Sequence, residues 1–418
     1  MKKIIALALA LVMLFAFAAC STSTDEETTD TETVATDIKI GVILVGDENE
    51  GYTAAHMEGI STAAETLGVA EDQIIWKYTV EESTACYDAA AELADAGCTL
   101  IIANSYGHGT FIMDAAADFP EVDFVAMTGD DASNSGLDNI YNAFTDVYEA
   151  RYISGVVAGL KIAELVENGE LSEANYDEDG NVKIGYVGAY AYAEVVSGYT
   201  AFFLGIQSVY PDVVMDVQYT FSWFDIDAEK TTAESLIASG CVIIGQHADS
   251  YGAPQACQTA QENGTVVYSV SYNVDMMDVA PDAVLTSSTN NWAVYYEYLF
   301  SAKINGEEIA VDWSEGYSMD AVGLTELNTA TIADGTEEAV EEAVAGIIDG
   351  SIQVFDTSTF TVDGETMDST YEIDLTVWGS AYVGEVVQPI IDGAFSESTF
   401  RSAPYFELRI DGITELNG

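Results

Sequence analysis

The stretch TFSWFDIDAEKTTAESLIASGCVIIGQHADSYGA, residues 220–253, carries the strongest fold signal in this chain. Within it, residues 241–245 are short and entirely apolar, which is typical of a strand buried on both faces of a sheet. In an open parallel α/β sheet, ligands bind beyond the carboxyl ends of the strands. The sequence therefore predicts that this strand ends at the lip of a binding site. A polar cluster follows it at once: Gln246, His247, Asp249, Ser250 and Tyr251.

An earlier stretch, GCTLIIANSYG at residues 97–107, repeats this pattern. It has the same Gly-Cys start, an apolar strand and the same Ser-Tyr-Gly exit. The Lys-Ile-Gly of residues 39–41 likewise returns at residues 183–185. Two copies of one pattern predict two similar lobes. This agrees with a length of 418 residues, which is too long for one ordinary hydrophobic core.

Strand patterns alternate with helix patterns from residue 38 onward, which predicts an α/β fold with parallel, doubly wound sheets. The expected strands are residues 38–45, 74–80, 99–103, 122–127, 139–144, 212–220, 242–245, 266–270, 283–287 and 405–410. The expected helices are residues 52–67, 83–96, 109–119, 146–167, 228–238, 254–263, 291–303 and 337–348.

The repeat and the alternation together set the expected domain boundaries. The first lobe is expected to comprise residues 38–145 together with a later part of the chain near residues 290–312. The second lobe takes residues 146–289 and part of residues 313–418. Residues 357–376 are acidic and rich in turn residues, so we expect a surface insertion there.

The first 37 residues have the pattern of an exported, membrane-anchored protein. Residues 1–19 combine two lysines, a short apolar run and small residues, as in a secretory signal peptide. The following Cys20 resembles the lipidated cysteine of bacterial lipoproteins, and residues 20–37 then form an acidic tether. We expect a protein anchored by lipid at the extracytoplasmic face of the cell membrane. The alternative is an ordinary signal cleavage that leaves a free cysteine.

The chain carries 71 acidic residues against 11 basic ones, a net charge of −60. Phosphate backbones would be repelled, so nucleic acid is excluded as an expected partner. Four further cysteines lie at positions 86, 98, 241 and 257. A helix of about 15–18 Å separates Cys86 from Cys98, which is beyond disulfide reach. Other pairings stay open, and small buried residues are the expected role.

The exits of the predicted strands supply the candidate site. They are aromatic and amide-rich and contain no expected cation, as suits a flat, uncharged heterocycle. The candidates are Tyr52, Asn104, Tyr106, Trp223, His247, Asp249 and Asp275. Alternatives remain for several of them: Tyr52 could pack on the sheet, and Asp249 and Asp275 could cap turns. His56 is expected to be a helix-face histidine bonded to backbone.

Catalytic and metal-binding motifs are missing from the sequence. It has no G-x-S-x-G, H-E-x-x-H, Cys-x-x-Cys or phosphate-binding loop. The three histidines, at positions 56, 108 and 247, have no spacing that suggests zinc. We therefore expect neither an enzyme nor a cofactor or metal.

Several motifs resemble the basic membrane protein family, the substrate-binding lipoproteins of ABC transporters related to purine nucleoside receptor lipoproteins. The similarity runs in order through residues 39–300. Its motifs are Ile40-Gly-Val-Ile, Gly51-Tyr-Thr-Ala-Ala-His56, Tyr148-Glu-Ala-Arg151-Tyr, Ser222-Trp-Phe-Asp225, Gln246-His-Ala-Asp-Ser250, Asp275-Met276, Leu285-Thr-Ser and Asn291-Trp292.

The resemblance implies a type I periplasmic-binding-protein fold, in which two Rossmann-like lobes joined by hinge crossovers close on a purine. The stacking aromatics would be Tyr52 and Trp223. Asn273 occupies the position at which the family carries a ligand-binding acidic residue, and Asp275 follows it two residues later. Asn290 stands where nucleoside-binding relatives carry Lys, so the chain looks more like the branch that holds a free base such as adenine.

The resemblance therefore implies a monomeric receptor that captures a purine base or nucleoside and delivers it to an ABC permease in the membrane. Two alternatives are a sugar or signal-molecule receptor of the same fold and a surface nucleoside hydrolase. The lack of a cleft arginine argues against the first. A hydrolase would need a metal or a carboxylate pair, which the sequence does not offer.

Overall fold

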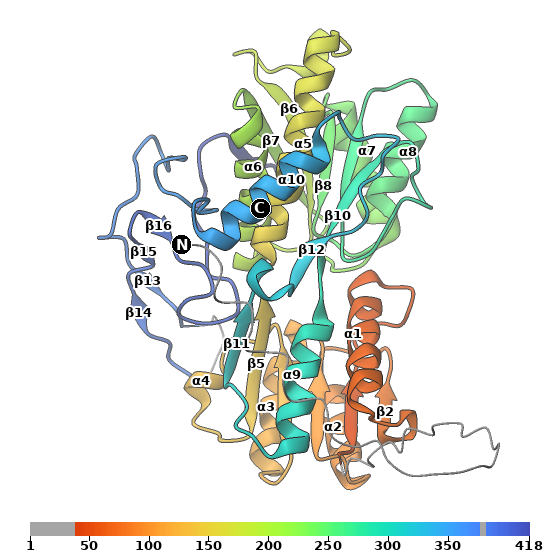
Figure 1. Ribbon diagram of the computed structural model, residues 1–418, viewed down its shortest axis with the longest axis vertical. Helices are drawn as coiled ribbons and strands as arrows, with labels where there is room; N and C mark the ends of the chain where they lie inside the picture. Colours follow the sequence, from red (N-terminus) through yellow and green to blue (C-terminus); the bar gives the residue numbers. More distant parts are fainter. Residues whose placement is uncertain (1–37, 377–381) are drawn as a thin grey trace, which may run out of the picture. The chain divides into compact units, whose positions relative to one another are not determined.

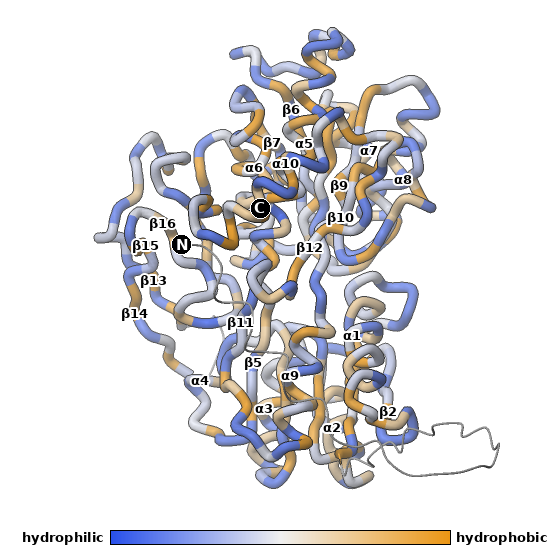
Figure 2. Tube along the Cα trace, in the orientation of Figure 1, coloured by the Kyte–Doolittle hydropathy of each residue, from blue (hydrophilic) through white to orange (hydrophobic). Residues whose placement is uncertain are grey.

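The computed structural model describes residues 38–376 and 382–418 (Figure 1). The predicted signal peptide, the lipid site at Cys20 and the acidic tether lie outside these residues. Hydrophobic residues gather along the strands of two sheets, and hydrophilic ones along the loops (Figure 2). Each sheet with its covering helices forms one of the two lobes discussed below.

The first lobe is built on a parallel sheet whose strand order is β11-β5-β4-β3-β1-β2. Helix α9 packs on α1, and α2 packs on α3. The strands are β1 (Ile40–Ile43), β2 (Ile74–Lys77), β3 (Leu100–Ala103), β4 (Asp123–Met127), β5 (Ile140–Thr145) and β11 (Asp312–Glu315). The helices are α1 (Gly51–Leu67), α2 (Thr84–Asp95), α3 (Gly109–Asp118), α4 (Ala132–Ser135) and α9 (Trp292–Asn305).

The second lobe is built on a sheet of order β12-β10-β9-β8-β6-β7-β17, in which β12 alone runs antiparallel to its neighbour. Its strands are β6 (Val182–Gly188), β7 (Val213–Tyr219), β8 (Ile243–Gln246), β9 (Tyr268–Tyr272), β10 (Val284–Asn290), β12 (Val322–Leu324) and β17 (Ile413–Glu415). Its helices are α5 (Val147–Asn168), α6 (Ala193–Val209), α7 (Ile226–Ala238), α8 (Gly252–Glu262) and α10 (Thr336–Asp349).

The two lobes repeat one topology, as the sequence echoes predict. The order β5-β4-β3-β1-β2 of the first sheet corresponds to β10-β9-β8-β6-β7 of the second. The echoed glycines occupy matching close contacts. A Cβ on Gly41 would lie 2.8 Å from Leu93, and one on Gly185 would lie 3.0 Å from Leu236. The Lys-Ile-Gly repeat therefore marks, in each lobe, a strand that a helix approaches closely.

Among the elements that the structure describes, the chain crosses between the lobes at three places: from β5 to α5, from β10 to α9, and from β11 to β12. The crossings are bonded to one another. Asp146 N donates to Glu315 O at 2.9 Å, and Asn291 N donates to Ala321 O at 2.8 Å. The hydroxyl of Thr145 also donates to the side-chain oxygen of Asn290. These bonds join the three crossings into one hinge.

The C-terminal segment, residues 358–418, differs from its predicted form. Residues 405–410 are mostly buried but form no strand, so the late strand expected there is wrong. The last strand is instead β17, which pairs in parallel with β7. Most residues in the range 357–376, which was expected to be a surface insertion, are exposed, while Phe360 and Leu375 within it are buried in the core of the second lobe. Irregular backbone can cover a core in this way without a periodic sequence pattern.

The four cysteines, at positions 86, 98, 241 and 257, are buried free thiols. Burial raises the pKa of Cys86 to about 12 and that of Cys241 to about 11. Their predicted role as small buried residues is confirmed. Within residues 38–376 and 382–418, we find no helix long and apolar enough to cross a membrane.

Glu397 places a carboxyl group inside the protein, where it is 4% exposed and accepts a bond from Tyr405 N at 3.4 Å. Burial raises its pKa to about 8 from an ordinary value of 4.5. The folded state therefore binds the carboxyl proton of Glu397 more tightly than the unfolded state does. The stability that this protonated carboxyl group contributes is fully present below the unfolded pKa. It is lost as the pH rises through the folded pKa.

We predict that the wild-type protein melts at a higher temperature at about pH 5.5 than at about pH 8.5. Glu397→Gln should reduce this difference, because its amide does not titrate. The exposed Glu385 of the same segment provides the control, and Glu385→Gln should leave the difference unchanged. Calorimetric melting curves at several pH values measure the effect. Equal slopes for the wild type and Glu397→Gln would contradict the prediction.

Candidate functional site

A cavity of about 450 Å³ lies where strands of both sheets end, and we call it the main cavity. It is lined by Val45, Gly46, Asp47, Asn49, Glu50, Tyr52, Thr79, Glu82, Ser105, Tyr106, Thr128, Tyr190, Glu194, Ser222, Trp223, Phe224, His247, Asp249 and Tyr272. The lobes touch beside it, because a Cβ on Gly51 would lie 3.2 Å from Asp249 O. Both halves of the repeat therefore contribute one wall each.

Aromatic rings form the apolar part of this lining. In the first lobe, Tyr52 packs at a right angle to Trp292, and its hydroxyl donates to Asn104 O at 2.5 Å. In the second lobe, Trp223 meets Tyr190 at a centroid distance of 5.1 Å and an angle of 64°. Both lobes therefore contribute aromatic rings to the cavity, and each of these rings packs against a neighbouring ring.

Carboxyl groups form the polar part of the lining. Glu50 accepts bonds from Tyr52 N at 2.9 Å and Thr53 N at 2.8 Å, and so caps the first turn of α1. Asp249 is buried on the opposite wall. Burial raises the pKa of both groups, and the nearby charge of Glu50 raises that of Asp249 further. A ligand that donates hydrogen bonds would stabilise these carboxyl groups in their charged form.

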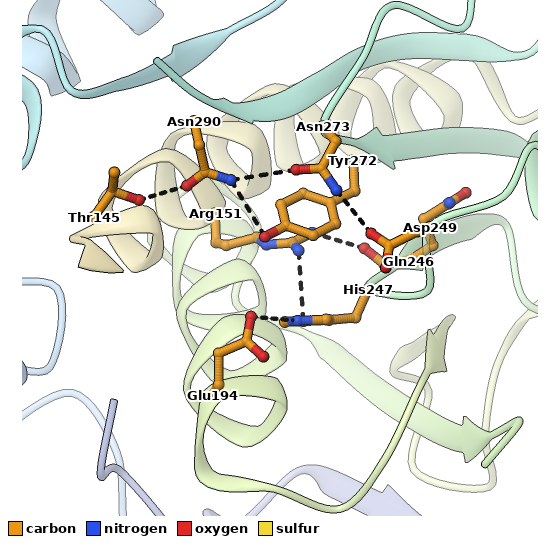
Figure 3. A network of polar contacts seen from close by, with 9 residues as sticks. All are labelled: Thr145, Arg151, Glu194, Gln246, His247, Asp249, Tyr272, Asn273 and Asn290. Atoms are coloured by element: carbon orange, nitrogen blue, oxygen red, sulfur yellow. Dashed lines mark hydrogen bonds and ion pairs between the residues drawn. The ribbon is translucent and has the colours of Figure 1, made fainter. Parts of the chain in front are cut away.

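A buried arginine organises the second wall (Figure 3). Arg151 lies in α5 and is 1% exposed; its Nη1 donates to Gln246 O at 2.6 Å. Its guanidinium lies 3.6 Å from the ring centroid of Tyr272, and its Nη2 is 3.4 Å from Nδ1 of His247. Arginine can only donate, so Nδ1 of His247 accepts and its Nε2–H donates to Glu194 Oε1 at 2.7 Å.

This arrangement keeps the imidazole neutral. Burial lowers the pKa of His247, and Arg151 lowers it further against the opposing effect of Glu194. The hydrogen bond from His247 therefore holds Glu194 in position, and Glu194 itself lines the main cavity. A guanidinium that does not line the cavity therefore contacts His247 and Tyr272, two residues of this wall.

A chain of buried amides runs from the hinge to the cavity (Figure 3). The Nδ2 of Asn290 donates to Asn273 Oδ1 at 3.2 Å, and the Nδ2 of Asn273 donates to Asp249 Oδ1 at 2.7 Å. At its other end Asn290 accepts from Thr145, as described above. Asn273 adopts a left-handed backbone, with φ of +63°. Together these hydrogen bonds connect a crossing between the lobes to Asp249, a carboxyl group of the cavity lining.

The predicted site residues divide into three groups. Those that line the main cavity are Tyr52, Tyr106, Trp223, His247 and Asp249. Those that are buried behind its walls are Asn104, Asn273 and Asn290. The remaining residue, Asp275, is exposed in a turn and accepts from Met277 N at 2.7 Å. In this arrangement the three buried amides support the walls, while Asp275 is away from the cavity.

The amide side chain of Asn104 illustrates this supporting role. Its Oδ1 accepts from Val45 N at 2.9 Å, and its Nδ2 donates to Thr53 Oγ1 at 3.3 Å. His56 is also internal, but its partner differs from the expected backbone group. Its Nδ1 lies 2.6 Å from the hydroxyl of Tyr296, and burial lowers its pKa to about 3.

Sequence reasoning missed Glu194, Arg151 and Thr128, and it did not single out Glu50 within the first strand exit. It also expected no pair of carboxyl groups, whereas the fold brings Glu50 and Asp249 close enough to interact. Helical spacing could not have indicated Arg151, because residues 150–159 of α5 are all buried. The described residues that line the main cavity include no Lys or Arg.

No group of three or more His, Cys, Asp or Glu side chains in the described ranges is arranged to hold a metal ion. The lining offers aromatic faces and hydrogen-bond acceptors instead. This combination suits a flat ligand with N–H or O–H donors.

Comparison with known proteins gives one family. The family described as ABC transporter substrate-binding protein, PnrA-like (Bmp), matches residues 38–357. A purine-binding protein of Brucella abortus is 30% identical over 319 residues, which cover 76% of this chain and 83% of that protein. Basic membrane protein A2 of Borrelia garinii is 24% identical over 255 residues, which cover 60% of this chain and 68% of that protein.

A solved solute-binding protein of an Aeropyrum pernix ABC transporter system has a similar fold. The two chains share 18% identity at a TM-score of 0.63, over 76% of this chain and 93% of the other. With the two repeated sheets, this likeness confirms the predicted type I periplasmic-binding-protein fold.

Arg151→Met should destabilise the protein by about 2–4 kcal/mol, because Gln246 O and His247 would lose a buried donor. Lys77→Met is the control, since the ion pair of Lys77 with Glu92 is at the surface and should be worth less than about 1 kcal/mol. Urea unfolding followed by circular dichroism measures both variants. Similar losses for the two variants would show that Arg151 does not organise the wall.

Proposed function

The chain belongs to the Bmp family of PnrA-like ABC transporter substrate-binding proteins, and on this premise we propose that it captures a purine base or purine nucleoside. The ligand is held in the main cavity and is delivered to a permease in the membrane. Proteins of this family bind substrates for ABC importers outside the cytoplasm and are not a family of enzymes.

The observation that carries the proposal is the pairing of Tyr52 and Trp223 on different lobes around one acceptor-rich cavity. Stacking of a base on an aromatic side chain contributes about 1–3 kcal/mol. A purine has two flat faces for these rings and N–H groups along its edge. The carboxyl groups of Glu194 and Asp249 line the cavity and can accept from those N–H groups.

The charge of the lining supports a neutral ligand. Phosphate groups are usually bound by Lys, Arg or a glycine-rich loop, and the described lining has no such cation. A ligand that lacks one of the N–H donors would lose a hydrogen bond to one of these carboxyl groups. Such mismatches are rejected strongly, so the acceptors would select among purines.

The two alternative functions have less support. The absence of Lys and Arg from the described lining disfavours a sugar receptor that grips hydroxyl groups with arginine. For a hydrolase, Glu50 and Asp249 would have to activate water. Both oxygens of Glu50 already cap α1, which favours a structural role for this carboxyl group.

Calorimetric titration with adenine, guanine, hypoxanthine and their nucleosides tests the proposal, and at least one should bind at micromolar or tighter affinity. Trp223→Ala and Tyr52→Ala should each weaken that binding at least about fivefold, in keeping with the loss of one stacking contact. Trp76→Ala is the control, because Trp76 stacks on Tyr78 outside the main cavity. Absence of heat with every purine would refute the ligand class.

We also propose that the protein is a monomer held at the outer face of the membrane by lipid on Cys20. This anchor is supported by the sequence pattern around Cys20. Cys20→Ser should move the protein from the membrane fraction to the soluble fraction of the producing cells, measured by immunoblotting. Retention of the variant in the membrane would contradict lipid anchoring at this residue.

A further inference from the structure

Residues 382–406 of the C-terminal segment lie against both lobes, and we call them the strap. The family match ends at residue 357, so the strap lies outside the part of the chain that matches the family. In Figure 1 the C-terminal part of the chain, in dark blue, runs from the second lobe to β11 of the first. The strap therefore connects the lobes in addition to the three crossings of the hinge.

Aromatic packing fixes the strap to the second lobe. Phe395 and Phe406 are buried in the core of that lobe, and their ring centroids are 4.8 Å apart. Phe406 also stacks on Phe355 at a centroid distance of 4.4 Å. Beyond the strap the chain continues to β17, which pairs with β7 of the second sheet. The strap is therefore a structural part of the second lobe.

The strap also contacts the first lobe. Tyr382 packs against the core of that lobe. Further along the strap, Ser402 N donates to Oδ2 of Asp312 in β11 at 3.0 Å. Burial raises the pKa of Asp312, while the hydrogen bonding of Ser402 and the charge of Arg401 act in the opposite direction. The strap thus presents both a donor and a positive charge to this carboxyl group.

The carboxyl group of Asp312 depends on the strap for its hydrogen bonding. Among the described residues, Ser402 is its only hydrogen-bond partner. The other oxygen, Oδ1, is buried and has no partner in the described part of the chain. Since a buried acceptor is costly without a donor, β11 would lose stabilisation if the strap moved away.

Separation of the lobes would break these contacts. β11 is paired with β5 and therefore moves with the first lobe, whereas the strap moves with the second. The bond from Ser402 to Asp312 and the packing of Tyr382 must both be lost before the strap and the first lobe can part. Loss of one hydrogen bond to a charged group changes an equilibrium by about tenfold.

We propose that the strap holds the two lobes together without ligand and so restrains the opening of the main cavity. The main cavity lies between the lobes, so the restraint limits both the entry and the release of a ligand. It acts on any ligand that the cavity takes. The inference therefore goes beyond the proposed purine binding and does not depend on it.

Reaction of an introduced cysteine measures this opening. Thr128 of the first lobe lines the main cavity and is 8% exposed, so Thr128→Cys places a thiol between the lobes. A maleimide joined to a long polyethylene glycol chain is too large for a cavity of about 450 Å³. Its rate of reaction with the ligand-free protein therefore follows the open population. The protein without Thr128→Cys gives the background rate of the native cysteines.

Asp312→Ala in the Thr128→Cys protein should raise this rate at least about fivefold, because Ser402 N loses its acceptor. Asp312→Asn keeps an acceptor oxygen and should give an intermediate rate. The matched control is Asp411→Ala. Oδ2 of Asp411 accepts from Gly364 N at 2.8 Å within the C-terminal segment, so this variant loses a comparable bond away from the first lobe. Its rate should equal that of the Thr128→Cys protein.

Tyr382→Ala removes the other contact with the first lobe and provides an independent variant. It should raise the rate at least about threefold, because apolar packing between the lobes is lost. Unchanged rates for Asp312→Ala and Tyr382→Ala would refute the strap. An equal increase for Asp411→Ala would show general loosening of the fold and would refute it as well. No purine is present in these reactions, so neither result bears on the proposed function, which calorimetry tests separately.

Discussion

The structure depends on polar groups that are buried at the chain crossings and satisfy one another. Thr145, Asn290, Asn273 and Asp249 form one bonded chain, and Arg151 supplies a second set of bonds to Gln246 O and His247. A buried donor or acceptor without its partner costs about 1–3 kcal/mol, so each member restricts the position of the next. The walls of the main cavity are placed by this interior network.

Most of the fold could be predicted because its signals are local. The apolar run at residues 241–245 becomes β8, and its echo at residues 97–107 contains β3 at the matching place in the other sheet. Alternation of short strands and amphipathic helices depends only on neighbouring residues. The Lys-Ile-Gly repeat then relates the lobes to each other. The C-terminal segment escaped this reasoning because irregular backbone that covers a core has no period.

The candidate site could be predicted only in part, for a related reason. Strand exits indicated Tyr52, Tyr106, Trp223, His247 and Asp249, all of which line the main cavity. The electrostatic interaction between Glu50 and Asp249, however, arises from packing of residues that are far apart in the sequence. The roles of Asn104, Asn273 and Asn290 as supports depend on which side of a wall each amide faces, and sequence spacing does not define this.

The interleaving of the lobes has a consequence for how the chain folds. The first sheet is completed by β11, which follows the first five strands of the second sheet, and α9 of the first lobe follows β10. Neither half can therefore finish its own core while it emerges from the ribosome or crosses a membrane. An exported chain of this design would stay incomplete, with apolar edges exposed, until both halves were available. Helper proteins that shield such edges would then matter more for its yield than for its final stability.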